Sequence, residues 1–212
     1  MTKPRTHRLF TFIPAHSRDR GSLEKLGLPA MICIVVLFCA AAVTAAPAQS
    51  TFFTSLVSFD WSNGASPYDA LVQGADGNFY GTTAWGGSFC PPNGCGTVFK
   101  LTPAGALTTL HSFDYIDGAI PYAAPVQASD GNFYGTTGSG GAYGAGTVFE
   151  MTPAGLLTTL YSFDSTDGGT PQAGLVQAAD GIFYGTTSGG GMYRTGTVFR
   201  IGVVRTCATC RR

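Results

Sequence analysis

Residues 96–114, GTVFKLTPAGALTTLHSFD, return almost unchanged as GTVFEMTPAGLLTTLYSFD at residues 146–164. A third copy begins at Gly196 with GTVFRIG, so the motif recurs every 50 residues. When residues 96–145 are aligned on residues 146–195 without gaps, 32 of the 50 positions are identical. Repetition at a fixed period of this length is typical of a tandem repeat in which each copy folds as one supersecondary unit.

Each copy of the repeat predicts four short strands. GTVFKLT alternates between the constant Phe99 and a neighbouring position that is Lys, Glu and Arg in turn, as expected for a strand with one packed and one solvated face. TPAG then predicts a hairpin turn, and the β-branched LTTL run predicts a second strand. APVQAS and NFYGTT, joined by Asp130-Gly131, predict a second hairpin that completes the unit.

Four antiparallel strands in about 50 residues is the size of one β-propeller blade. Residues 49–201 are therefore expected to form an all-β, propeller-like tandem repeat of three four-stranded blades. Stacking of neighbouring blades would bury the apolar faces that a single blade leaves exposed.

The number of copies leaves the closure of this propeller open. Propellers usually have about four to eight blades, so three copies favour an incomplete or self-associating propeller. The second-strand pattern at residues 51–60 and the first-strand pattern at residues 196–202 could pair as one closing hairpin. A closed three-unit ring, an open arc, and half of a six-blade homodimer joined through open blade edges all fit the repeat.

Composition excludes two broad classes. The 212 residues include 12 basic and 12 acidic side chains, but from Gln49 onward there are 6 basic and 10 acidic ones. No basic face remains to neutralise phosphates, which excludes a nucleic-acid binder. The 30 glycines and 12 prolines exclude a helical bundle.

Residues 1–48 are predicted to be a signal peptide or an N-terminal membrane anchor. The uncharged run from Pro29 to Ala46 follows a basic segment and has an apolar centre shorter than the roughly 20 residues of a membrane-spanning helix. It ends in Ala46-Pro47-Ala48, a small-x-small cleavage pattern. We therefore expect an exported protein, extracellular, periplasmic or at the cell surface, that touches a membrane only if this segment stays uncleaved.

DGNFYGTT, the double glycine, GTVFK, TPAG and LTTLHSF resemble the repeat of the bacterial "choice-of-anchor tandem repeat GloVer-containing" proteins. The resemblance extends from Thr51 to about Ile201. It implies an exported protein of a kind that is often held at the cell surface by a C-terminal anchor. It carries over no catalytic residue.

The Gly-rich loop before each GTVF motif is the predicted ligand surface. The three loops hold Trp85 (with Phe89), Tyr143 and Tyr193 among glycines. Exposed aromatic planes can stack on sugar rings, and glycine lets a partner approach closely; the alternative is that the rings fold inward as plugs. We expect a non-enzymatic binding or scaffolding module for a glycan or a protein, and the alternative is a carbohydrate-active hydrolase that uses the same loops.

SFDWSNG, SFDYIDG and SFDSTDG place a second oxygen-bearing side chain three residues after each Asp. Asp114 with Asp117 and Asp164 with Asp167 offer oxygen ligands of the kind that Ca²⁺ prefers. The same residues also cap turns through their own backbone, and Asn63 in the first copy suits capping equally well. Capping is the prediction and calcium the weaker alternative, and no metal and no cofactor are expected.

No catalytic residue is predicted. His111, the only histidine after the leader, matches Tyr161 and Val57 in the other copies, which predicts a packing position. A catalytic acid would not alternate with a basic residue, yet Glu150 matches Lys100.

Four cysteines lie beyond the leader. Cys90 and Cys95 flank PPNG in an insertion that is confined to the first copy, and a disulfide between them is predicted for an oxidising compartment. Cys207 and Cys210 belong to a short tail, residues 202–212, that abandons the repeat. A tail disulfide is expected there rather than a metal or redox site.

Overall fold

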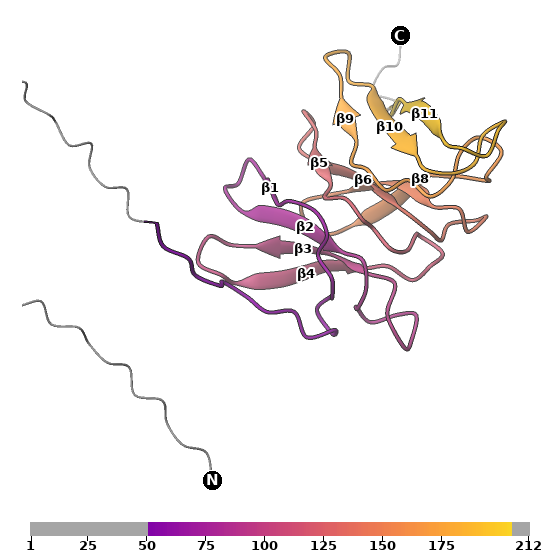
Figure 1. Ribbon diagram of the computed structural model, residues 1–212. Helices are drawn as coiled ribbons and strands as arrows, with labels where there is room; N and C mark the ends of the chain where they lie inside the picture. Colours follow the sequence, from indigo (N-terminus) through magenta and orange to yellow (C-terminus); the bar gives the residue numbers. More distant parts are fainter. Residues whose placement is uncertain (1–50, 205–212) are drawn as a thin grey trace, which may run out of the picture. The chain divides into compact units, whose positions relative to one another are not determined.

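The computed structural model describes residues 51–204, which contain eleven strands in three antiparallel sheets and no helix (Figure 1). The first sheet consists of β1 (Val72–Gln73), β2 (Phe79–Thr83), β3 (Thr97–Leu101) and β4 (Leu107–Ser112). The second consists of β5 (Val126–Gln127), β6 (Phe133–Thr137), β7 (Thr147–Met151) and β8 (Leu157–Ser162). The third has only three strands: β9 (Val176–Gln177), β10 (Phe183–Thr187) and β11 (Thr197–Ile201). The all-β, propeller-like fold class is confirmed.

Each blade combines strands from two successive copies of the sequence repeat. In the first sheet FYGTT pairs with TVFKL, so that Phe79 lies opposite Leu101 and Thr83 opposite Thr97. The blade therefore begins at the VQ strand rather than at GTVF. Periodicity alone cannot place this boundary, because a repeat has the same period wherever its first residue is set.

The pairing of β6 with β7 explains the glycine in FYGTT. Gly135 lies opposite Phe149, and an ideal Cβ on Gly135 would be 2.5 Å from Cζ of that ring. The phenylalanine thus covers the glycine and fills the space that a side chain would take. The same arrangement recurs in the other blades at Gly81 with Phe99 and at Gly185 with Phe199.

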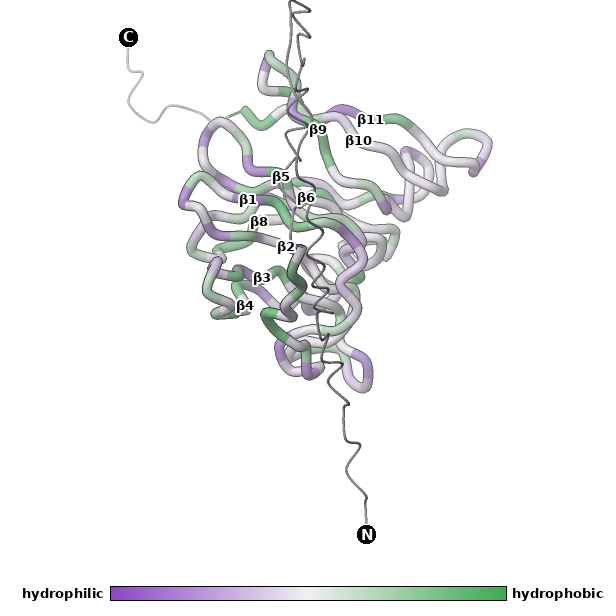
Figure 2. Tube along the Cα trace, turned by 60° about the vertical axis from the view of Figure 1, so that its left-hand side comes forward, coloured by the Kyte–Doolittle hydropathy of each residue, from purple (hydrophilic) through white to green (hydrophobic). Residues whose placement is uncertain are grey.

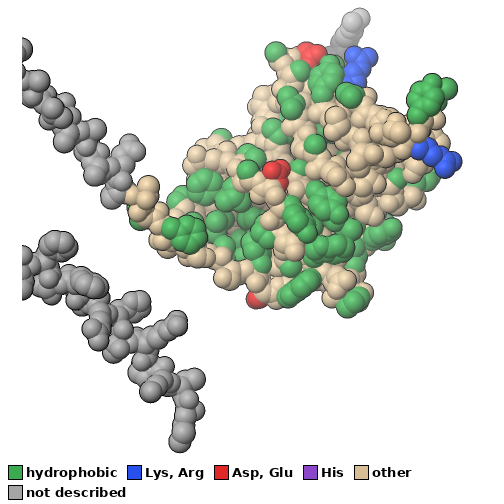
Figure 3. All heavy atoms as spheres, viewed as in Figure 1, with side chains coloured by type: hydrophobic (Ala, Val, Ile, Leu, Met, Phe, Trp, Pro, Cys, Tyr) green, Lys and Arg blue, Asp and Glu red, His purple; other side chains and the backbone are tan. Residues whose placement is uncertain are grey.

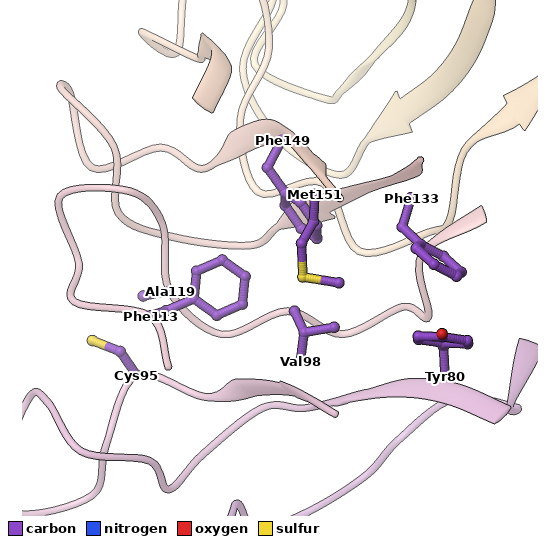
Figure 4. Packing of buried hydrophobic residues seen from close by; sticks show 8 residues of the cluster. All are labelled: Tyr80, Cys95, Val98, Phe113, Ala119, Phe133, Phe149 and Met151. Atoms are coloured by element: carbon purple, nitrogen blue, oxygen red, sulfur yellow. The ribbon is translucent and has the colours of Figure 1, made fainter. Parts of the chain in front are cut away.

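Neighbouring blades stack through contacts between aromatic side chains. Tyr80 of the first blade lies 4.1 Å, between ring centroids, from Phe133 of the second, and Phe113 meets Phe149 edge-on at 5.5 Å. Figure 4 shows these side chains in the cluster between the first two blades. An equivalent cluster joins the second and third blades. Figure 2 shows hydrophobic and hydrophilic residues side by side along the strands, for example in β3, where Lys100 lies between Phe99 and Leu101.

The three blades do not close into a ring. In the described residues β11 pairs only with β10, and residues 53–58 belong to no strand. The closing hairpin that the sequence allowed between residues 51–60 and 196–202 is therefore absent from this part of the chain. Three blades are fewer than the roughly four of the smallest usual propellers, so the first and third blades are not brought side by side.

The predicted leader, residues 1–48, and the tail cysteines Cys207 and Cys210 lie outside the described residues. Between residues 51 and 204, no helix is long and apolar enough to cross a membrane.

Candidate functional site

The Gly-rich loops and the acidic turns share one end of the blades, which we call the loop face. It consists of the turns at residues 60–64, 114–118 and 164–168 and the loops at residues 84–96, 138–146 and 188–196. The loops follow β2, β6 and β10, and two of the turns follow β4 and β8, which run in the same direction in their antiparallel sheets. Each turn meets a loop: the Gly141 N–H donates to the Tyr115 carbonyl at 2.8 Å.

The acidic turns are closed by reciprocal hydrogen bonds. The Asp114 N–H donates to Asp117 Oδ1 at 3.1 Å, and the Asp117 N–H donates to Asp114 Oδ1 at 3.1 Å. Asp60 and Asn63 exchange the same two bonds, which shows why the amide replaces a carboxylate without loss of the turn. Asp164 and Asp167 repeat the pattern at 3.3 Å. Groups of three or more His, Cys, Asp or Glu that could hold a metal ion are absent from residues 51–204.

Two of the acidic turns favour the charged form of their leading carboxylates, Asp60 and Asp164. The Thr166 hydroxyl and neighbouring backbone N–H groups lower the pKa of Asp164 below its ordinary value. The Ser62 hydroxyl and the Asn63 N–H do the same to the pKa of Asp60. A general acid for glycoside hydrolysis needs a raised pKa, so these hydrogen bonds act in the opposite direction.

His111 has a polar role as well as a packing one. Its Nε2 lies 2.6 Å from Asp117 Oδ2, and its ring meets Phe113 edge-on at 5.1 Å between centroids. Burial alone would raise the pKa of Asp117, but the hydrogen bonds from His111 and the Asp114 backbone outweigh burial and lower it. The packing position predicted from the sequence is thus also a brace for the turn. The alternation of residues along the strand could not reveal this bond, because Asp117 lies six residues further on, in the turn.

Tyr161 braces the third acidic turn in the same way. Its hydroxyl donates to Asp167 Oδ2, and this hydrogen bond is the main cause that raises the pKa of Tyr161 to about 12. Val57, which holds the matching position before the first blade, cannot make such a bond. Histidine and tyrosine can replace each other here because each reaches the carboxylate at the matching position of its own turn.

The aromatic residues of the Gly-rich loops do not all occupy one position. Trp85 is half-buried, and its backbone exchanges hydrogen bonds with Ala65 at 2.8 and 3.1 Å. Tyr143 and Tyr193 instead lie two residues after Gly141 and Gly191 and are 69% and 78% exposed. Phe89, 50% exposed, holds the matching place in the first blade. The set of repeated exposed rings is Phe89, Tyr143 and Tyr193.

The third blade has a hollow between its acidic turn and its Gly-rich loop. Ser165 and Thr166 line one side, and Met192 and Arg194 line the other. The exposed Tyr193 lies in the same loop, between Met192 and Arg194. A cation and hydroxyl groups therefore border this concave surface.

Cys90 and Cys95 face each other at the base of the enlarged first loop. Their Cα atoms are 5.5 Å apart and their Sγ atoms are at bonding distance. The pair packs against the cluster between the first two blades. The disulfide stays a prediction, for which the structure supplies suitable geometry.

The hairpins at the other end of the blades use their aspartates structurally. Asp76 Oδ1 accepts from the Asn78 N–H at 3.1 Å, and the Tyr80 hydroxyl donates to Asp76 Oδ2 at 2.9 Å. Asp130 and Tyr134 make the matching bond at 2.8 Å in the second blade. These carboxylates anchor a buried tyrosine at the interface between blades.

The repeat described as the Gloeobacter/Verrucomicrobia repeat matches residues 41–209 of the sequence. The chain belongs to this family. This match confirms the resemblance seen in the repeated motifs. No curated protein matches the sequence.

Among solved structures, one similar chain is that of a protein provisionally named a gluconolactonase. The identity is 20% and the TM-score 0.37, and the match covers 55% of this chain and 40% of the other. The matched region is thus less than half of that protein, and a likeness of this size carries no argument about activity.

Proposed function

We propose that this repeat protein is an exported, non-enzymatic binding or scaffolding module that holds glycans on its loop face. The observation that carries the proposal is the exposure of Phe89, Tyr143 and Tyr193 at one loop position of three successive blades. Rings that fold inward as plugs would be buried, and these are not. Aromatic planes presented in a row suit the apolar faces of successive sugar rings.

Polar groups beside the rings suit the hydroxyls of a sugar. The carboxylates of the acidic turns lie at the base of the Gly-rich loops, and Arg194 borders the hollow of the third blade. A ligand that spans several blades would meet the same pair of features repeatedly, so weak contacts would add along a chain. A polysaccharide satisfies this geometry better than a single small sugar.

The state of the carboxylates supports the non-enzymatic part of the proposal. Hydrogen bonds of the acidic turns lower the pKa values of Asp60, Asp117 and Asp164, and the same carboxylates cap backbone N–H groups. A hydrolase would need one carboxyl group kept protonated near the scissile bond.

Export rests on the sequence of the leader. Residues 29–48 combine a short apolar run with a small-x-small end, which is the pattern of a secretory signal. A sugar-binding protein with an oxidised Cys90–Cys95 pair would be suited to the cell surface or the space outside the membrane. Detection of the protein in culture medium, periplasm or on intact cells with an antibody tests this part separately.

The test of the ligand surface is a triple variant, Phe89→Ala, Tyr143→Ala and Tyr193→Ala. The purified protein is measured against arrayed oligosaccharides and insoluble polysaccharides. We expect the affinity of the best binder to fall at least about tenfold, because several stacking contacts are lost together. Circular dichroism checks that the variant keeps its β-sheet signal.

Leu156→Ala is the matched control. Leu156 is 71% exposed, but it lies in the hairpin between β7 and β8, at the opposite end of the blades. The control should bind as the unchanged protein does. Equal binding by the triple variant, or an unchanged protein that binds proteins but no arrayed glycan, would overturn the assignment to glycans.

A further inference from the structure

The third blade leaves both the edge of its last strand and one of its apolar faces exposed. β11 has no partner on its outer side within residues 51–204. Val198 on this strand is 80% exposed, whereas its counterparts Val98 and Val148 are 0% and 1% exposed. Tyr184 is 38% exposed, although the matching Tyr80 and Tyr134 are buried. These side chains face the direction in which each earlier blade meets the next one.

Residues 53–58, FTSLVS, repeat the sequence of a fourth strand without being part of a sheet. They align with β4, LTTLHS, and Phe53 and Leu56 match Leu107 and Leu110. The segment already lies against the first blade as β4 lies against the second. Ideal Cβ atoms on the matching turn glycines would be 3.1 Å from the Leu56 carbonyl oxygen and 2.5 Å from the Leu110 carbonyl oxygen.

The residues after this segment dock in the same repeated way. Phe59 meets Phe99 edge-on at 5.1 Å, as Phe113 meets Phe149 at 5.5 Å. The Thr97 hydroxyl donates to the Asn63 carbonyl at 3.3 Å, matching the bond from Thr147 to Asp117. Residues 53–58 therefore have the sequence of a fourth strand but lack the three strands that would precede it in a blade. Within residues 51–204, β9, β10 and β11 are three strands that lack a fourth.

The two free parts also have complementary side chains. Leu157 fills a place in the cluster between the first two blades, whereas within residues 51–204 the cluster between the second and third has no fourth-strand residue at that place, and Val203 packs against it. A hollow of about 340 Å³ lies there instead, lined by Val148, Phe163, Phe199 and Ile201 among others. Phe53, the counterpart of Leu157, is 93% exposed.

The hydrogen-bond pattern between blades is also left half-made at both ends. The Ala75 N–H donates to Gln127 Oε1 at 2.7 Å, and the Ser129 N–H donates to Gln177 Oε1 at 3.1 Å. Gln73 is the matching acceptor at the exposed face of the first blade, and Ala179 carries the matching N–H in the third. Figure 3 shows hydrophobic side chains gathered over the part of the molecule that carries β1–β4.

We propose that β11 of one copy pairs with residues 53–58 of a second copy, and the reverse, so that two chains close a six-blade ring. Each chain would supply its residues 53–58 to β11 of the other, so the same contact occurs twice around a two-fold axis. Six blades lie within the usual range of about four to eight, and three do not. Pairing covers the exposed edge and places Phe53 of each copy in the hollow of the other.

The register follows from the pairs inside the chain. Lys100 lies opposite Thr108 in the first blade, and Glu150 lies opposite Thr158 in the second. The matching pair across two copies is Arg200 with Thr54. Cα atoms of directly opposed residues in antiparallel strands are about 4.5–5.5 Å apart, which suits a disulfide.

The decisive experiment oxidises the Thr54→Cys, Arg200→Cys double variant in a mixture of isotope-labelled and unlabelled protein. Peptide mass spectrometry then identifies the linked pair regardless of the native cysteines. We expect a disulfide that joins the two introduced cysteines between labelled and unlabelled chains, and a species of two chains on a non-reducing gel. A link within one chain would show a three-blade ring and overturn the proposal, as would no link or a ladder of longer chains.

The mass in solution of the unlinked protein is the second measurement. We expect light scattering to give the mass of two chains, and Val198→Lys to give that of one chain at the same concentration. Val198 is already exposed in the single chain, so the substitution leaves its core intact. Met192→Lys, at an 87% exposed residue of the loop face, is the control and should remain a dimer. A single-chain mass for the unchanged protein would refute the pairing.

Discussion

Gly146→Ala should destabilise the protein far more than Gly131→Ala, although both glycines have a positive φ, +100° and +85°. An ideal Cβ on Gly146 would lie 2.3 Å from the Thr137 carbonyl oxygen and 2.8 Å from Pro171 Cδ. At Gly131, the hairpin glycine, nothing lies within 4 Å of the same atom. The two substitutions therefore share the conformational cost and differ in the steric one.

The conformational cost of alanine at positive φ is about 1–2 kcal/mol. The overlap with a backbone oxygen adds roughly 1–3 kcal/mol, as other overpacked sites do. We expect about 1–2 kcal/mol for Gly131→Ala and about 2–5 kcal/mol for Gly146→Ala, out of a total of about 5–15 kcal/mol for a domain. Urea denaturation, followed by circular dichroism, measures both. Equal midpoints for the two variants would refute the close approach of β7 to the end of β6.

Three further predictions concern titration, metal and redox state. Burial and the hydrogen bond to Asp76 raise the pKa of Tyr80 to about 12 from 10.0, so the stability due to the neutral phenol is complete below pH 10 and is lost as the pH rises toward 12. Urea titrations across this window should show a smaller loss for Tyr80→Phe, and an identical loss would contradict the assignment. Thermal melts with Ca²⁺ and with a chelator should coincide, because the acidic turns are closed by backbone hydrogen bonds; a rise of several degrees with Ca²⁺ would show a bound ion. Reduction, or Cys90→Ser with Cys95→Ser, should lower the free energy of unfolding by about 2–3 kcal/mol or less, and an unchanged urea midpoint in the oxidised and reduced protein would count against the disulfide.

The repeated motif was enough to predict the strands and the stacking of blades. Alternation around Phe99 identifies a packed and a solvated face, and the turn sequences TPAG and Asp-Gly mark where the chain reverses. These are local properties, since they depend on side-chain direction and backbone dihedrals over a few residues. They hold in every copy because the copies share those residues.

The loop residues show where local reasoning was insufficient. Trp85 and Phe89 both lie among glycines, and a four-residue insertion hides which of them matches Tyr143. The backbone pairing of Trp85 with Ala65, a residue 20 positions away, places the tryptophan in the framework and leaves Phe89 exposed. The bond between His111 and Asp117 is likewise a product of how the turn folds back over β4.

The amino-acid order by itself determined that this protein is made of pleated, repeated β units, because period, alternation and turn chemistry are written into each copy. Only the tertiary structure decided where a blade starts, which rings reach solvent and that, within residues 51–204, residues 53–58 do not pair with β11 to complete the third sheet. The reason is that these properties depend on contacts between residues far apart in the sequence. Such contacts form only when whole blades stack, and a repeat contains the same local information whether or not its last blade finds a neighbour.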